Sequence, residues 1–184
     1  MWVTIRPVGL TSLLQRADTQ GYHWPMPEQN LNIRPARQWD HLLINHVIEQ
    51  AVMGWDLPER VKQLSVSSYY YHEYDFEHYR IVVAEIGNEI VGVVAWEMQP
   101  VVIQNSKKAL VIHGIFINPR YQKKGIGTRL FHLAVKAAQK EHYDGLLVRA
   151  QKDAEGFFVR MGMKKLDVID DRRDYAHRYW KSLK

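Results

Sequence analysis

The stretch Gln122-Lys123-Lys124-Gly125-Ile126-Gly127-Thr128 decides how the rest of the sequence is interpreted. Asn118-Pro119 ends an apolar run just before it, and from Ile126 apolar residues recur with helical spacing. Two glycines at this strand-to-helix junction remove side chains where a ligand has to approach the backbone. The start of a helix adds unpaired N–H groups and the positive end of the helix dipole, which suit a pyrophosphate.

Other phosphate-binding motifs fit this stretch less well. The dinucleotide fingerprint needs a third glycine where Leu130 stands, and a Walker A loop needs Gly-Lys-Ser/Thr, which the stretch lacks. A lysine-rich turn, whose glycines only allow a tight bend, is the structural alternative. The flanking sequence has to decide between the two.

The elements around the stretch predict a mixed α/β fold. Runs rich in valine and isoleucine at 80–86 and 89–97 flank Gly87-Asn88, which predicts a β-hairpin. The other expected elements are strands at 31–34, 109–117, 146–150, 163–169 and 175–182, helices at 42–53, 58–66, 126–144 and 154–161, and a loop at 67–79. This order indicates a mixed, mostly antiparallel sheet of about six to seven strands, flanked by helices, with one central β-loop-α-β unit.

Composition sets the class of protein. A chain of 184 residues with 46% apolar and 24% charged residues is typical of one globular domain. We expect that domain at 31–184, after an irregular N-terminal extension at 1–30. No run approaches the roughly 20 apolar residues that span a bilayer, and no signal peptide is recognised, so a cytoplasmic protein without a membrane partner is expected. Zero cysteines exclude disulfides, thiolate metal sites and a cysteine nucleophile.

Charge is distributed unevenly along the chain. Residues 1–105 hold 7 Lys/Arg and 12 Asp/Glu, a net charge of −5, whereas residues 106–184 hold 18 and 8, a net charge of +10. Such a split indicates either that the second half meets a polyanion or that helix faces are simply solvated. Nucleic acid is disfavoured as the polyanion, because aromatic residues are not interleaved with basic ones around 120–130.

With its flanks, the stretch resembles the GNAT acetyltransferases, whose signature loop reads Q/R-x-x-G-x-G/A. Gln122, Gly125 and Gly127 match it without gaps. The similarity extends to the hairpin, to the strand at 146–150, and to Ala154-x-x-Phe157-Phe158-x-x-x-Gly162-Met163, which is similar to the family's A-x-x-F-Y-x-x-x-G-F. It covers about residues 31–182 and implies the GNAT fold.

The resemblance implies acetyl-CoA as co-substrate. No metal is expected, because no strong ligand spacing accompanies His72 and His78. The amides of 123–128 are then expected to bind the pyrophosphate, and the backbone of 115–117 to pair with the pantetheine arm like an added strand. One amide on this strand, that of Phe116 or of the neighbouring Ile117, is expected to stabilise the oxyanion of the reaction. The implied coenzyme-binding residues are Ile115, Phe116, Ile117, Gln122, Lys123, Lys124, Gly125, Ile126, Gly127, Thr128 and Gln151.

The resemblance also proposes a base but leaves the acid open. His113 stands nine residues before Gln122, where family members carry a glutamate or histidine base, and a histidine can accept a proton at neutral pH. A structural role in the strand is the alternative. The tyrosine that serves as general acid in the family falls at Phe158, which has no proton to give. Either water, Tyr175 or Tyr179 then donates the proton, or the thiolate leaves unprotonated.

The function implied is transfer of an acetyl group from acetyl-CoA to a primary amine of a small molecule or peptide, by direct attack on the thioester. A non-catalytic coenzyme-A-binding sensor or regulatory module is the alternative, and Phe158 favours it. The acidic, tyrosine-rich loop at 69–79 is either the acceptor site or a solvated loop. The sequence leaves the acceptor open and is compatible with a homodimer.

Overall fold

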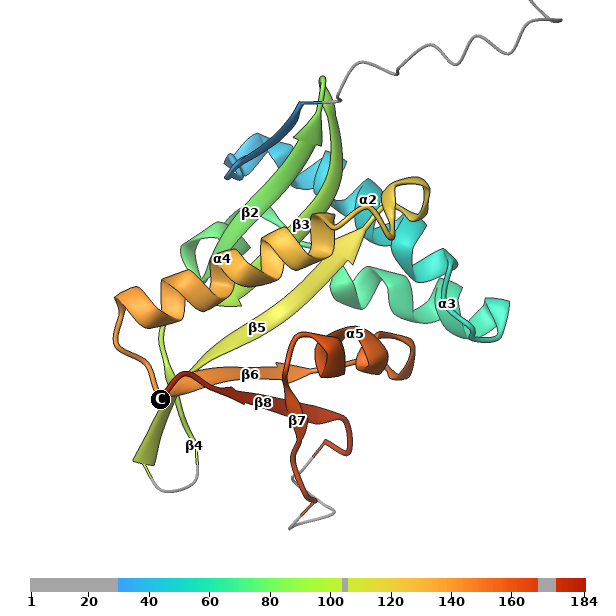
Figure 1. Cartoon of the computed structure of the whole chain (residues 1–184). Helices are drawn as coiled ribbons and strands as arrows, with labels where there is room; N and C mark the ends of the chain where they lie inside the picture. The colour runs from blue at the N-terminus through green and yellow to red at the C-terminus, as the bar shows by residue number, and fades with distance from the viewer. Residues whose placement is uncertain (1–29, 104–105, 169–174) are drawn as a thin grey trace, which may run out of the picture.

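Eight strands form one sheet in the computed structural model, which describes residues 30–103, 106–168 and 175–184 (Figure 1). The order across the sheet is β1-β2-β3-β5-β6-β8-β7, with β4 pairing β5. All neighbours are antiparallel except β5 and β6, which run parallel. The strands are β1 (Leu31–Pro35), β2 (Tyr79–Ile86), β3 (Glu89–Glu97), β4 (Val101–Ile103), β5 (Lys107–Ile117), β6 (Gly145–Arg149), β7 (Lys164–Lys165) and β8 (Arg178–Ser182). The expected mixed, mostly antiparallel sheet is confirmed.

The described sheet differs from the expected one at its short strands. It has one strand more than the six to seven expected, because β4 was not predicted; its three residues include the exposed Val101 and Val102, so no alternation marks it. β7 has only two residues, where a strand at 163–169 was expected. Apart from Asn30, the expected extension at 1–30 lies outside the described residues.

Helices cover both faces of the sheet (Figure 1). α4 (Ile126–Lys140) packs on one face through Leu130, Phe131, Ala134 and Ala138, and α2 (His41–Met53) on the other through Ile44, Val47 and Ile48. β3 lies between these two layers, and its residues 90–96 are all buried. α3 (Glu59–Ser65) and α5 (Glu155–Arg160) complete the set of described α-helices, none of which is long and apolar enough to cross a membrane.

Two segments differ in detail from expectation. α4 ends at Lys140, before the expected end at Asp144-Gly145, because His142 adopts a left-handed conformation with φ of 56°. Asp144 instead accepts a hydrogen bond from the Lys108 N–H at 2.8 Å, which ties the turn to the start of β5. The loop expected at 67–79 contains two short 3-10 helices, Val66–Tyr69 and Glu73–Glu77.

β5 carries a bulge at His113. Ala95 of β3 pairs with Gly114 and Trp96 with Ile112, so His113 is the extra residue. The bulge switches which side chains face α4. Before it these are Leu110 and Ile112, and after it they are Ile115 and Ile117, while Phe116 turns to the α2 side.

Beyond the bulge, β5 and β6 separate. Their parallel pairing runs from Ala109 with Gly145 to Ile112 with Val148 and stops there. Within the described residues, 114–117 therefore pair with β3 on one edge and with no strand on the other. Figure 1 shows the two strands diverging, with α5 at the end of β6.

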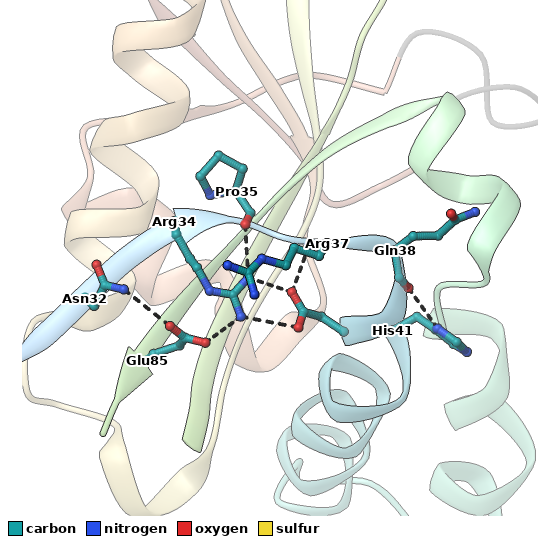
Figure 2. A network of polar contacts seen from close by, with 8 residues as sticks. Asn32, Arg34, Pro35, Arg37, Gln38, His41 and Glu85 are labelled. Atoms are coloured by element: carbon teal, nitrogen blue, oxygen red, sulfur yellow. Dashed lines mark hydrogen bonds and ion pairs between the residues drawn. The ribbon is translucent and has the colours of Figure 1, made fainter. Parts of the chain in front are cut away.

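A polar network ties β1 to the start of α2 and to β2 (Figure 2). Arg34 donates to Asp40 at 2.6 Å and to Glu85 at 2.5 Å, and the Arg37 backbone N–H donates to Asp40 at 2.7 Å. Burial disfavours the charged form of Asp40, but the hydrogen bonds from Arg34 and Arg37 outweigh it and lower the Asp40 pKa. The hydrogen bond from Arg34 likewise lowers the pKa of Glu85.

We expect Arg34→Met to lower the free energy of unfolding by about 2 kcal/mol, since it leaves the Asp40 carboxylate buried without its cationic partner. Urea unfolding at pH 7 measures the loss, with Arg60→Met on the exposed surface of α3 as the control. The folded-state pKa values of both carboxyls lie below the unfolded values, so the network's contribution is complete above about pH 4–5 and is lost as the pH falls through the folded values. An equal difference between wild type and variant at pH 7 and pH 3 would contradict this account.

Candidate active site

A cleft of about 740 Å³ opens between the end of β5, the N-terminus of α4 and α5. This volume is in the range of small-molecule sites. Of the residues expected to bind a coenzyme, the cleft is lined by 115–117, 122–123 and 125–128. Lys124 and Gln151 do not line it: the Lys124 ammonium lies 5.1 Å from the centre of the Tyr121 ring, and Gln151 binds Tyr69.

The loop before α4 presents backbone N–H groups to this cleft. Lys123 and Gly125 have positive φ values of 59° and 80°. The Arg129 N–H donates to the Gly125 carbonyl at 3.1 Å, as an α-helix requires, so the N–H groups of 126–128 precede the helical ladder. These three N–H groups and the helix dipole favour an anion at this end of the cleft.

The loop and the start of α4 lie close to β5. The Gln122 side chain donates to the Ile117 carbonyl at 3.2 Å. At Gly127, an added Cβ would lie 3.4 Å from the Phe157 ring and 3.7 Å from the Ile117 side chain. These are ordinary van der Waals distances, so a methyl group would fit at 127, whereas a longer side chain would enter the space between α4, β5 and α5.

The unpaired edge of β5 forms one wall of the cleft, and its free amides belong to Ile115 and Ile117. The Asn118 N–H donates to Val91 of β3 at 2.9 Å. Because N–H directions alternate along a strand, the Phe116 amide also faces β3, and the amides on either side face the cleft. Of the two expected oxyanion donors, this geometry favours Ile117 over Phe116.

His113 lies beside the cleft, on the α2 side of the sheet. Its Nδ1 is 2.8 Å from the Tyr71 hydroxyl, and its ring centre is 4.5 Å from that of Tyr79. Burial lowers the His113 pKa; the charge of Asp75 opposes the shift and that of Arg149 adds to it. His113 is thus neutral at pH 7, as a base has to be.

Tyr71 fixes the position of the His113 ring. Its side chain is only 1% exposed, and burial raises the pKa of its hydroxyl. Asn45 of α2 holds the Tyr71 backbone with two hydrogen bonds of 2.8 Å, one to the N–H and one to the carbonyl. If His113 Nδ1–H donates to Tyr71, Nε2 is free to accept a proton; if Tyr71 donates to Nδ1, Nε2 carries the proton itself.

The residues considered as proton donors are spread over the structure. Phe158 lines the cleft and is 4% exposed in the core against α4, so it contributes only apolar surface. Tyr179 is buried and hydrogen-bonded to Glu155, and Tyr175 is exposed with its ring against His177.

Sequence reasoning missed Trp55 at the site and included Tyr69 only as the first residue of the candidate acceptor loop at 69–79. Trp55 lines the cleft, and the Tyr69 ring contacts it at 5.3 Å and Phe116 at 5.9 Å. The Tyr69 hydroxyl accepts a hydrogen bond from Gln151 Nε2 at 2.7 Å. Nothing in the run of three tyrosines at 69–71 distinguishes Tyr69. In the described residues, no group of His, Asp and Glu side chains could hold a metal ion.

Comparison with known proteins gives a family match. Residues 43–163 match the family model described as acetyltransferase (GNAT) family. Two similar solved structures are a PaiA N-acetyltransferase from Thermoplasma acidophilum in complex with coenzyme A and a GNAT family acetyltransferase from Brucella melitensis in complex with acetyl-CoA. The alignment with the first structure has a TM-score of 0.64 at 17% identity, and it covers 83% of this chain and 98% of the Thermoplasma chain. The alignment with the second has a TM-score of 0.58 at 18% identity, and it covers 85% of this chain and 90% of the Brucella chain. A search of curated proteins finds no match.

Proposed function

Because this chain belongs to the acetyltransferase (GNAT) family, we propose that it transfers an acetyl group from acetyl-CoA to a primary amine of a small molecule or peptide. The observation that carries the proposal is the single cleft in which the N–H groups of 126–128 and the unpaired edge of β5 meet. Two solved structures with this fold contain coenzyme A or acetyl-CoA, which supports the same co-substrate here. The activity is assigned to one domain at 31–184.

In this proposal the pyrophosphate and the pantetheine arm of the coenzyme meet different parts of the cleft. The pyrophosphate accepts hydrogen bonds from the amides of the loop and the first turn of α4. Lys123, Lys124 and Arg129 are exposed around that end and attract the anion at long range. The pantetheine arm pairs with the free edge of β5, which supplies affinity without requiring particular side chains.

The acetyl group then lies beside the C-terminal part of β5, between the amide of Ile117 and the bulge at His113. The amine nitrogen attacks the carbonyl carbon, and the Ile117 N–H stabilises the charge that develops on the carbonyl oxygen. His113 accepts the proton that the nitrogen loses, directly or through a water. The bulge turns His113 toward the α2 side, where the tyrosine-rich segment at 69–79 borders the position of the incoming amine.

Phe158 gives the second candidate function its support. A coenzyme-A-binding sensor needs the cleft but no proton donor, and Phe158 supplies none at the position where the family signature has tyrosine. The two functions differ in whether bound acetyl-CoA is consumed.

Thiol release from acetyl-CoA in the presence of pooled primary amines tests the proposal. The chain has no cysteine, so a thiol reagent detects only the coenzyme that is released. We expect release that depends on both enzyme and amine, with acetylated amine found by mass spectrometry. A reaction without amine measures hydrolysis. Saturable binding of acetyl-CoA with no release from any amine in a broad pool would favour the sensor, and no binding would contradict both functions.

A further inference from the structure

Tyr69 spans the opening between the diverging ends of β5 and β6. Its ring packs edge-on against Phe116 of β5, with the ring centres 5.9 Å apart. Its hydroxyl reaches Gln151, which follows β6, at 2.7 Å. Neither Tyr69 nor Gln151 lines the cleft itself, but the Tyr69 ring contacts two residues that do, Trp55 and Phe116. A ligand that lies along the free edge of β5 and extends past Phe116 would therefore approach the Tyr69 hydroxyl.

The Tyr69 hydroxyl is arranged to give a proton rather than to receive one. Gln151 Nε2 donates to its oxygen, so the hydroxyl hydrogen takes no part in that bond. Among the described residues, no acceptor for this hydrogen lies within hydrogen-bond distance. Burial and the neighbouring Tyr175 raise the Tyr69 pKa, and the bond from Gln151 opposes them only in part, so the phenol stays protonated at neutral pH.

A second bridge keeps the two sides of the gap together. The Asp56 backbone N–H, in the segment between α2 and α3, donates to the Asp153 carboxylate at 2.6 Å. Asp153 belongs to the same short 3-10 helix that Gln151 caps. This bond holds the segment of Trp55, against which the Tyr69 ring packs, beside the segment of Gln151.

We propose that Tyr69 donates its hydroxyl proton to the coenzyme sulfur as the thioester breaks, with Gln151 as a positioning residue. This step rests on the proposed acetyl transfer. As the carbon–sulfur bond breaks, sulfur keeps the bonding electron pair and takes the proton from the Tyr69 oxygen. The amine nitrogen has lost one proton to His113, and that proton returns to the Tyr69 phenolate through solvent. The products are the amide and the free thiol, and the enzyme regains its initial protonation.

The other tyrosines suit this step less well. Tyr179 is buried, and its hydroxyl is hydrogen-bonded to the Glu155 carboxylate. Tyr175 is 40% exposed and packs against His177, whereas Tyr69 touches both Trp55 and Phe116, which line the cleft. Tyr175→Phe is thus a matched comparison for Tyr69→Phe.

Single-turnover acetyl transfer with the full-length Tyr69→Phe variant tests the step. The ring and its packing remain and only the proton is lost, so we expect the rate to fall by about 10²-fold. Acetyl-CoA affinity should stay within about twofold of wild type, because the proton is transferred only in the transition state. Tyr175→Phe should transfer at close to the wild-type rate.

The oxygen-ester analogue of acetyl-CoA separates a proton donor from a structural role. Its leaving group is an alkoxide, which is a much stronger base than a thiolate. Loss of the proton donor should therefore slow acetyl transfer from the oxygen ester more than acetyl transfer from the thioester. Gln151→Met should also lose more rate on the oxygen ester than on the thioester, but both losses should be smaller than in Tyr69→Phe. It provides a second test if Tyr69→Phe does not fold. Equal losses on both esters, an unchanged rate in Tyr69→Phe, or a large loss only in Tyr175→Phe would overturn the proposal. If wild type transfers no acetyl group at all, the proposed function has failed instead.

Discussion

Replacement of His113 with alanine is expected to lower turnover by about 10²-fold or more and to leave acetyl-CoA affinity nearly intact, because general base catalysis acts in the transition state. The bulge places His113 outside the lining of the cleft, so its imidazole is not needed to bind the coenzyme. Turnover and affinity are measured separately, by thiol release and by calorimetry. His132→Ala, at an exposed position on α4, is the matched control.

The pH dependence of the rate provides an independent test of His113. Four groups lie around it: the hydroxyl of Tyr71, the ring of Tyr79, the carboxylate of Asp75 and the guanidinium of Arg149. Because burial lowers its pKa, the rate should rise with pH through a group that titrates below about 6.5, the ordinary histidine value. This rise of the rate with pH should disappear in His113→Ala. Full turnover of the variant at every pH would remove His113 from the mechanism, and loss of coenzyme binding would mean that it supports the strand.

Substitutions in the glycine loop should have the largest effect on binding. We expect Gly127→Leu to weaken acetyl-CoA binding by about 10²-fold or more, equivalent to losing two charge-assisted hydrogen bonds. The new side chain would enter the space that Phe157 and Ile117 border, where the backbone of α4 has to approach the ligand. Calorimetric titration measures the change, and thermal unfolding without ligand shows whether the variant is folded.

A pair of alanine substitutions separates the loop from general backbone strain. Gly125 and Gly87 both have positive φ, 80° and 61°, and an added Cβ meets no atom within 4 Å at either site. Alanine therefore introduces comparable strain at both positions. We expect Gly125→Ala to weaken acetyl-CoA binding and Gly87→Ala, in the β2–β3 turn, to leave it unchanged. If Gly125→Ala, Gly87→Ala and Gly127→Leu all bind acetyl-CoA as tightly as wild type, the loop is only a turn.

The parts of the fold that depend on local chemistry were predictable from the sequence. Gly87-Asn88 specified the hairpin, and Asn118-Pro119 followed by spaced apolar residues specified the strand-to-helix junction. Nine of the residues that the resemblance of this junction to the GNAT signature implied do line the cleft. Each of these features is set by neighbours in the chain, which is what a sequence pattern records.

The parts that depend on pairing between distant segments were not predictable. The run from Ala109 to Ile117 is apolar except for His113 and Gly114, so no alternation revealed the bulge or the direction of the Phe116 amide. Tyr69 belongs to the site through contacts with residues far away in the sequence, Phe116 and, 82 residues from Tyr69, Gln151. The three exposed or partly exposed residues of β4 carry no pattern at all.

Titration of the wild-type protein with acetyl-CoA tests the central claim most directly. The account predicts saturable binding at one site per chain, and a rise in stability of about 2.7 kcal/mol when the ligand is at 100 times its dissociation constant. The same titration of Gly127→Leu should show strongly reduced binding. An absence of both heat and thermal stabilisation with the folded wild-type protein at millimolar acetyl-CoA would contradict the account.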